Sequence, residues 1–250
     1  MREIIQDPIN SKSAIRNPKS EIRNPKFSLV SRYDQKLEFI LRNASRIFAE
    51  KGYHSTTMRD ISRATGISLA GLYHYCKSKE ELLFLIQDNC FGRVLERLKE
   101  RLRETESAVG RLRVFIENHL SFFAANMAEM KVLSHEEESL AGDKHQQVAN
   151  KKREYTKRVR QILAQLQDTK EGKQKVDLTV ATYALFGMLN WIYNWYDPKG
   201  NLKVNDLAEN VTRLFLGGFS SGDVSTDLPS TVSHKTENIS VWRAGQVKKT

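Results

Sequence analysis

Polar, aromatic and cationic side chains are concentrated in one short stretch of this chain. The stretch ISLAGLYHYCKSKEEL, residues 67–82, combines two small residues with two tyrosines, a histidine and two lysines. Phenol, imidazole and ammonium groups bind phosphate oxygens and base edges, and aromatic rings contact thymine methyl groups. Small side chains at Ala70 and Gly71 would let the backbone approach the floor of a major groove. The stretch therefore predicts a DNA-reading surface.

A structural explanation of the same residues stays open. Tyr73 and Tyr75 would then pack against a preceding helix, and Lys77 and Lys79 would form a solvated face. Lys79 also lies in the first turn of the next expected helix, where a cation and a helix N-terminus together favour a phosphate. Because all these features fall within one short segment, the DNA-reading interpretation is favoured.

Short capped helices are the elements that would position this stretch. Apolar residues from Leu37 to Phe48 recur at helical spacing, and Gly52 follows in the usual position of a helix C-cap. Hydroxyl residues mark three further helix starts, and two of them have an acidic partner at capping-box spacing. The three are Thr57 with Asp60, Ser68, and Ser78 with Glu81. Since Gly66 ends the second helix, this order predicts a helix-turn-helix within a small bundle, with Leu72 facing inward.

The remaining chain has helical periodicity to about residue 219, without the alternation of β-strands. The expected helical segments are 81–105, 109–128, 145–168, 175–196 and 203–218. We therefore expect an all-α fold, with an N-terminal helix-turn-helix three-helix domain and a larger helical-bundle domain for ligand binding and dimerisation. The domain ranges are a leader over 1–30, the helix-turn-helix domain over 31–80, the effector-binding and dimerisation domain over 81–219, and a disordered tail over 220–250. The leader contains the repeat IRNPKSEIRNPK, which is interpreted as low complexity or as a basic arm along DNA.

The composition favours a polyanionic partner but does not distinguish between nucleic acid and an acidic membrane. Forty Lys and Arg against 30 Asp and Glu give a net charge of +10, which suits nucleic acid or an acidic membrane surface. The two cysteines, Cys76 and Cys90, form no spaced framework, and the first thirty residues hold no apolar run typical of a secretory signal. The longest apolar stretch, Leu178–Tyr193, is too short to span a bilayer and contains Asn190. A cytoplasmic protein without a membrane-embedded segment is expected.

The segment IFAEKGYHSTTMRDISRATGISLAGLYHYCKSKEEL, Ile47–Leu82, resembles the DNA-binding domain of TetR-type transcriptional regulators, and the match extends over about residues 35–86. The resemblance implies an all-α homodimer that binds a palindromic operator and is released by a small effector. It also implies phosphate contacts from Thr57, Ser68, Tyr73 and Lys79, and base-edge contacts from Leu69, Ala70 and His74. Two positions depart from the family: Leu69 stands where a lysine is frequent, and Cys76 where phenylalanine is usual.

A second segment, Ala184–Phe219, resembles the C-terminal helices of TetR-type regulators of fatty-acid and sterol catabolism, as does REY at Arg153–Tyr155. Many members of that group respond to acyl-coenzyme A (acyl-CoA) thioesters, so the effector is expected to be small and apolar or acyl-CoA-like. An acyl chain needs an apolar tunnel between helices. The expected lining is Phe122, Phe123, Met127, Tyr183, Met188 and Trp191, although an aromatic stripe at this spacing also fits an ordinary core.

The phosphate-rich head of coenzyme A needs cations, and one segment is rich in them. The candidate residues are Lys151, Lys152, Arg153, Lys157, Arg158 and Arg160, which a solvated helix face would equally explain. The last two helices are expected to form a homodimer interface. Its expected residues are Leu178, Leu185, Leu189, Leu214 and Phe215.

Other chemistry is not favoured by the sequence. HEEES, at His135–Ser139, lacks the second histidine of a metalloprotease motif, and neither a phosphate-binding glycine loop nor a nucleophile–base pair is present. We therefore expect no enzyme activity, no metal and no cofactor. The competing hypothesis is a basic helical module that binds anionic membranes or acyl carriers without DNA, and it depends on residues 144–160.

Overall fold

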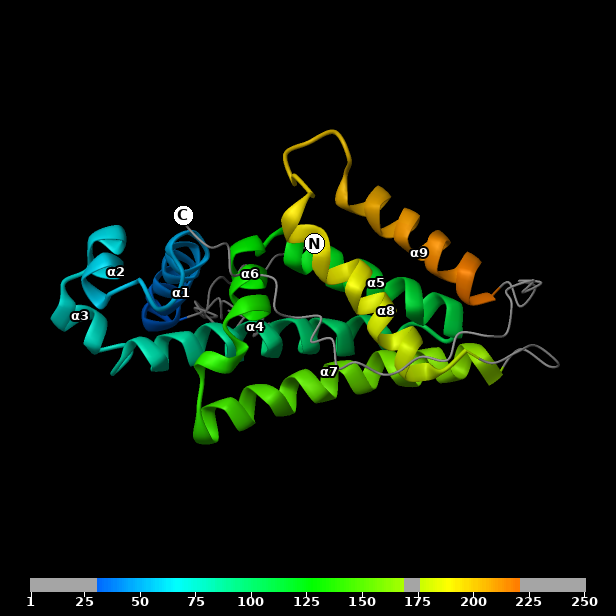
Figure 1. Cartoon of the computed structure of the whole chain (residues 1–250), viewed down its shortest axis with the longest axis horizontal. Coiled ribbons are helices and arrows are strands. Elements are labelled where there is room, and N and C mark those ends of the chain that lie inside the picture. Colours follow the sequence, from blue (N-terminus) through cyan, green and yellow to red (C-terminus); the bar gives the residue numbers. More distant parts are fainter. Residues whose placement is uncertain (1–30, 169–175, 221–250) are drawn as a thin grey trace, which may run out of the picture.

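The computed structural model describes residues 31–168 and 176–220, and this part of the chain is helical without a β-strand. The expected all-α fold is confirmed. The leader expected over 1–30 and the tail expected beyond Ser220 lie outside the described residues. The helix-turn-helix helices lie at one end of the molecule, and α4 runs from them into the effector bundle (Figure 1).

The helices, in chain order, are α1 (Arg32–Lys51), α2 (Met58–Thr65), α3 (Leu69–Tyr73), α4 (Lys79–Leu102), α5 (Ala108–Ala124), α6 (Met127–His135), the 3₁₀ helix η1 (Glu137–Ser139), α7 (Gly142–Asp168), α8 (Leu178–Asn190), the 3₁₀ helix η2 (Trp191–Asn194) and α9 (Val204–Ser220). The single helix expected over 109–128 is wrong, because the chain turns at Ala125 and Asn126 and starts the separate helix α6. The Asn126 side chain donates to the Phe122 carbonyl at 2.6 Å, which satisfies an orphan acceptor at the end of α5.

Two apolar cores hold the helices together. The first joins α1 to α4 through fully buried side chains such as Ile40, Ile61 and Leu72. It is completed from the effector domain, by Val132 of α6 and Val148 of α7. The helix-turn-helix domain therefore does not close its own core.

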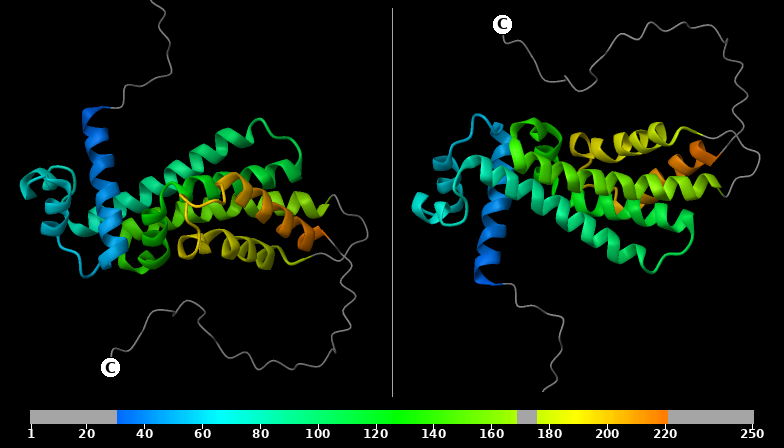
Figure 2. Two further views of the ribbon diagram at one scale, coloured as in Figure 1. Left: turned by 90° about the horizontal axis from the view of Figure 1, so that it is seen from above. Right: turned by 90° about the horizontal axis from the view of Figure 1, so that it is seen from below.

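The second core belongs to the effector domain and packs α5 against α4, α7, α8 and α9. The two views of Figure 2 show α8 and α9 on the outside of this bundle. The expected dimer residues Leu185 and Leu189 are fully buried within this core, and Phe215 is 8% exposed. The dimer-interface prediction for these three residues is therefore wrong. Leu178 is half-buried against the core, and Leu214 is 70% exposed.

Gly66 sits in the left-handed region with φ +67°, between α2 and the recognition helix. A side chain there costs about 1–2 kcal/mol, because Cβ approaches the following carbonyl oxygen. Gly66→Ala should lower the free energy of unfolding by about that amount in urea unfolding. Gly92→Ala is the matched control, since Gly92 is helical and its added Cβ meets only Lys151 Nζ at 3.5 Å. A stability loss of equal size in both variants would contradict the strain argument.

Candidate nucleic-acid interface

Thr57 and Asp60 form the reciprocal cap that opens α2. The Asp60 N–H donates to Thr57 Oγ1 at 3.2 Å, and the Thr57 N–H donates to Asp60 Oδ2 at 2.9 Å. Hydrogen bonds from Thr57 lower the pKa of Asp60 to about 2, so the cap carries a negative charge at neutral pH. Thr57 is exposed, but its hydroxyl also donates to this carboxylate at 2.6 Å. A phosphate contact through Thr57 stays a prediction, and it would compete with the cap.

Side-chain hydrogen bonds and close packing fix the turn between α2 and α3. The Ser62 hydroxyl donates to the Ile67 carbonyl at 2.6 Å, and Ser68 caps α3 by accepting from the Gly71 N–H at 3.1 Å. A Cβ on Gly71 would lie 2.9 Å from Ile67 Cγ2. The missing side chain at Gly71 is therefore required by the turn itself, in addition to any close approach to DNA.

The recognition helix α3 buries one side and exposes the other. Leu72 is fully buried and Cys76 is 2% exposed, so both hold the segment against the bundle. Tyr73 is 49% exposed, and Ala70 and His74 are also exposed. The side chains of the expected reading surface thus face outward. Ser68 is exposed as well, whereas Leu69, Gly71 and Tyr75 are half-buried at its edge.

The ammonium group of Lys79 points into the protein, whereas the expected phosphate contact needs it to face outward. Its ammonium donates to the carbonyls of Tyr53 at 2.9 Å, of His54 at 3.2 Å and of Thr56 at 2.9 Å. An ammonium has three donors, and all three are used here. It also lies 4.4 Å from the centroid of the Tyr53 ring. Lys79 therefore fastens the loop between α1 and α2 to the start of α4.

The expected capping box at the start of α4 is only half formed. The Ser78 hydroxyl accepts from the Glu81 N–H at 3.0 Å, as expected. The Glu81 carboxylate instead accepts from the backbone N–H of Lys77, one residue before the cap. This contact fixes the chain between α3 and α4.

Tyr33, in the first turn of α1, belongs to the same surface and was not expected there. Its ring stacks on Tyr75 at 4.8 Å between centroids and meets His74 edge-on at 6.1 Å. The three rings form a cluster that supports the exposed His74 from behind. Sequence periodicity could not find this contact, because nearly all of α1 and the whole of α2 lie between Tyr33 and α3.

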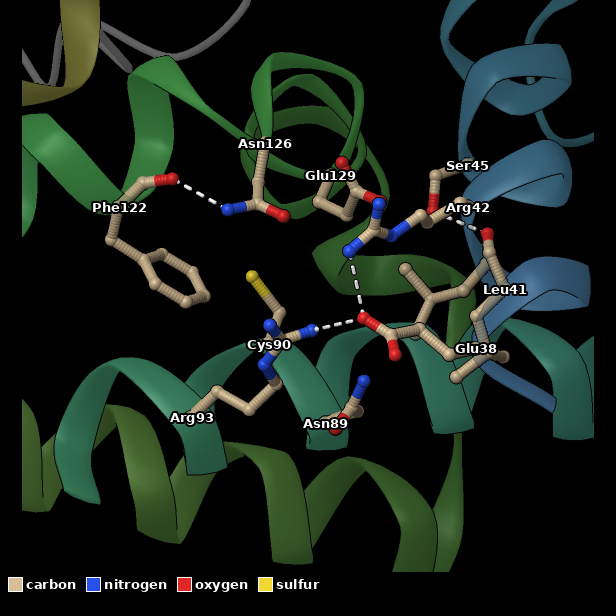
Figure 3. A pocket seen from close by; sticks show the side chains of 11 residues that line it. Glu38, Leu41, Arg42, Ser45, Asn89, Cys90, Arg93, Phe122, Asn126 and Glu129 are labelled. Atoms are coloured by element: carbon tan, nitrogen blue, oxygen red, sulfur yellow. Dashed lines mark hydrogen bonds and ion pairs between the residues drawn. The ribbon is translucent and has the colours of Figure 1, made fainter. Parts of the chain in front are cut away.

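A polar junction joins α1 to the effector domain. Figure 3 shows the guanidinium groups of Arg42 and Arg93 converging on the Glu38 carboxylate, at 2.8 and 3.0 Å. Glu129 of α6 lies beside them, and burial raises the pKa of its carboxyl while Arg42 and Arg93 oppose the rise. The junction encloses about 20 Å³, room for a single water.

The expected effector-site residues are divided between the inside and the outside of the protomer. Phe122 and Phe123 are 6% and 4% exposed in the effector core, and Met127 packs against them half-buried. Tyr183, Met188 and Trp191 are instead exposed on α8 and η2. They do not line an interior tunnel with the phenylalanines. The assignment failed because α8 is apolar on all sides, so its spacing does not show which face is inward.

The basic segment of α7 is largely paired within the protein. Lys151 binds Asp88, Arg158 binds Glu154, and Arg160 donates to Thr179 Oγ1 at 2.9 Å. Arg153 is exposed and donates to Asn150. These pairs weaken the membrane-module hypothesis, which needs free cations on one face. Among the residues that the structure describes, three or more metal-ligating side chains do not cluster, and the helices are too short or too polar to cross a bilayer.

Comparison with known proteins supports both domains separately. Residues 40–86 match the family described as bacterial regulatory proteins, tetR family. Residues 105–219 match the family described as tetracyclin repressor-like, C-terminal domain. The first range contains the helix-turn-helix, and the second contains α5 to α9.

Individual relatives match over nearly their whole length. The fatty acid metabolism regulator protein of Bacillus subtilis (strain 168) is 26% identical over 186 residues, covering 72% of this chain and 93% of that protein. A TetR-family regulator from Bordetella parapertussis 12822 has a solved structure with 30% identity and a TM-score of 0.68, covering 74% and 95%. The structure of AibR with isovaleryl coenzyme A and operator DNA has 27% identity and a TM-score of 0.64, covering 72% and 97%.

The role of Lys79 can be separated from a phosphate contact. Lys79→Met leaves three carbonyls without their donor, so the free energy of unfolding should fall by about 1–3 kcal/mol. The slope of log affinity against log salt should stay unchanged, whereas a lost phosphate contact lowers it by about 0.9. Lys77→Met is the matched control, because Lys77 is exposed and its stability effect should stay within about 0.5 kcal/mol. A reduced salt slope with unchanged stability in Lys79→Met would contradict this role.

Tyr33 should support DNA binding through its ring. Stacked aromatic pairs contribute about 0.5–1.5 kcal/mol, so Tyr33→Ala should weaken operator binding about two- to tenfold, measured by fluorescence anisotropy. Tyr33→Phe keeps the stacking and should bind like the unmodified protein. If Tyr33→Phe binds as weakly as Tyr33→Ala, the hydroxyl itself contacts DNA and the supporting role is wrong.

Glu129 should make stability depend on pH. Because its pKa is raised in the folded state, its contribution is fully present below the unfolded pKa, about 4.3, and is lost as pH rises through the folded value. Glu129→Gln should therefore melt at a higher temperature than the unmodified protein at pH 8, and the difference should shrink towards pH 4. The control Glu50→Gln, at an exposed position, should show no such trend. Parallel melting curves for Glu129→Gln and the unmodified protein across this range would contradict the assignment.

Proposed function

Because this chain belongs to the TetR family of transcriptional regulators, and is a ligand-responsive DNA-binding protein rather than an enzyme, we propose that it is a cytoplasmic repressor. It binds a palindromic operator as a homodimer through the surface around Tyr73 and His74. An acyl-CoA-like effector releases it. The single observation that carries this proposal is the recognition helix, which faces outward from a helix-turn-helix domain. The apolar core of that domain is completed by α6 of the effector domain.

The proposed dimer forms through the exposed face of α8 and α9. Val180, Tyr183 and Trp191 are 63%, 64% and 60% exposed, and they recur at helical spacing on one stripe. Gly187 lies between them with open space around it, and Leu214 of α9 is 70% exposed. An apolar stripe of this kind is typical of a protein contact. A second copy suits it, because one short recognition helix makes too few contacts for a specific site.

The proposed effector class rests on the relatives and on the effector core. AibR has been solved with isovaleryl coenzyme A and operator DNA, and the Bacillus subtilis relative regulates fatty acid metabolism. The core of the effector domain is apolar and rich in aromatic side chains, which are common around small-molecule sites. In this proposal, residues 31–80 bind DNA, and residues 81–219 bind the effector and form the dimer.

The proposed mechanism is a shift between two conformations. Effector binding inside the effector bundle displaces α6, and α6 displaces α1 because Val132 is part of the first core. The two recognition helices of the dimer then lose the spacing of successive major grooves. Effector and operator consequently weaken each other's binding by the same factor.

An electrophoretic mobility shift with the upstream region of the gene tests the proposal. The protein should shift a specific palindromic fragment at moderate salt, and isovaleryl-CoA or dodecanoyl-CoA should release it. His74→Ala should weaken specific binding about 5- to 150-fold, from a loss of about 1–3 kcal/mol per base contact. Absence of sequence-selective binding would exclude the repressor function. Vesicle binding that is unaffected by His74→Ala would favour the membrane module.

The dimer contact gives a separate prediction. Leu214→Glu places a charge on the exposed face of α9 in the proposed dimer contact, so the dimer should dissociate to monomers in analytical ultracentrifugation. Operator binding should fall with it. Phe39→Glu is the matched control, because Phe39 is 44% exposed but lies on α1, away from the stripe. A dimer that persists in Leu214→Glu would place the interface elsewhere.

A further inference from the structure

Polar contacts join the loop between α1 and α2 to the effector domain, and the proposed mechanism does not use them. This loop, residues 52–57, ends at Thr57, which caps α2. Glu136 is the C-cap of α6, and its carboxylate Oε1 accepts from the backbone N–H of Tyr53 at 3.4 Å. The Glu136 carbonyl accepts from Nε2 of the buried Gln87 of α4 at 3.0 Å. The end of α6 is thus fixed to α4 and also reaches the DNA-binding domain.

Ser139 holds the carboxylate of Glu136 in place. Its hydroxyl donates to Glu136 Oε2 at 2.8 Å and lies 3.4 Å from Nε2 of His54. Burial raises the pKa of the Tyr53 phenol, and the charges of Glu80 and Glu136 add to the rise, so the charge of Glu136 acts on the loop. At 3.4 Å the contact with the Tyr53 N–H is long for a hydrogen bond, but the negative charge of the acceptor strengthens it.

The same loop is also held by Lys79, at the start of α4. Its ammonium donates to three backbone carbonyls of the loop at 2.9 to 3.2 Å. The loop therefore has two anchors, one on its carbonyls from α4 and one on the Tyr53 N–H from Glu136. Of the two, the Glu136 contact is the longer, so a displacement of α6 would break it first.

We propose that Glu136 is a positioning residue for operator binding, which holds the loop before α2 in the arrangement that reads DNA. Because Ser62 and Gly71 fix the turn between α2 and α3, a shift of α2 carries the recognition helix with it. Val132 contributes to the apolar packing of α6 on α1, whereas Glu136 fixes the loop that follows α1. This inference rests on the proposed function. It adds a residue of the effector domain that sets the DNA-reading surface from a distance.

Operator binding by Glu136→Ala tests this role. The variant removes the acceptor for the Tyr53 N–H, so affinity for the operator fragment found by mobility shift should fall about three- to tenfold in fluorescence anisotropy. Affinity for a duplex of equal length without the site should not fall, because phosphate contacts carry no sequence information. Glu136→Gln keeps an acceptor oxygen and should recover most of the loss.

Glu138→Ala is the matched control. Glu138 is exposed on η1, and its substitution changes the net charge by the same amount, so this variant should bind the operator at least as tightly as the unmodified protein. Melting temperatures of all variants separate positioning from loss of the fold. If Glu136→Ala does not fold, Ser139→Ala supplies the second test. It removes the donor to Glu136 Oε2 and should weaken operator binding about two- to threefold.

Hydrogen exchange followed by mass spectrometry gives a readout that is independent of DNA. A peptide covering residues 52–57 should exchange faster in Glu136→Ala than in the unmodified protein. The same peptide should exchange at the unmodified rate in Glu136→Gln and Glu138→Ala. An unchanged rate in Glu136→Ala would show that Glu136 does not hold the loop and would overturn the inference.

The outcomes separate this inference from the proposed function. Faster loop exchange with unchanged operator affinity in Glu136→Ala would overturn the positioning role and leave the regulator intact. An equal loss of affinity for the operator and for the unrelated duplex would also overturn it, because positioning affects sequence-specific contacts. Absence of sequence-selective binding by the unmodified protein would overturn the proposed function itself.

Discussion

The packing of α6 against α1 is the contact on which the rest of the structure depends. Without it, the apolar core of the helix-turn-helix would be left open on one side, because Val132 of α6 belongs to that core. Burying each aliphatic side chain contributes about 1.5–3 kcal/mol, so this shared core stabilises the DNA-binding domain directly. In the proposed mechanism, a movement of α6 would reach α1 as a packing change, which a flexible linker would not transmit.

The charged groups beside this core have a different role from the apolar ones. The Glu38 pairs with Arg42 and Arg93 are partly exposed, so each contributes little to stability. Burial disfavours the ionised carboxylate of Glu129 and so raises its pKa. While it is ionised, Glu129 therefore disfavours close packing of α6. The junction thus combines a strong non-directional contact with polar groups that can exchange partners. That combination suits an interface with two arrangements of similar free energy.

Local features were predictable from the sequence, whereas long-range ones were not. Thr57, Asp60, Gly66 and Ser68 act within a few residues of themselves, so their capping and turn roles follow from spacing alone. The ammonium of Lys79 binds carbonyls 23 to 26 residues away, and no local pattern indicates such partners. The sequence-based prediction assigned the inward and outward faces of α8 the wrong way round for a related reason. Its apolar residues surround the helix, and only the position of α5 and α7 decides that Leu185 is inside and Tyr183 is outside.

The effector core shows the same limit. His119 stands in the apolar stretch HLSFFA of α5, and an isolated histidine there gives a weak signal by itself. Its partner becomes visible only in the folded chain, where the Tyr155 hydroxyl of α7 lies 3.3 Å from His119 Nδ1. The general class of regulator could thus be predicted, because it resides in a local motif. The polar groups of the core could not, because they meet through tertiary packing.

The close fit of Gly71 on Ile67 has a consequence for redesign of the DNA-reading segment. Gly71, Leu72 and Cys76 are constrained by packing against the protein, while Ala70, Tyr73 and His74 project away from it. In the segment between Gly66 and Ser78, the outward-facing residues can therefore be substituted while the inward-facing residues are retained. A regulator with a new operator and an unchanged effector response could be built on this scaffold by altering those three outward side chains.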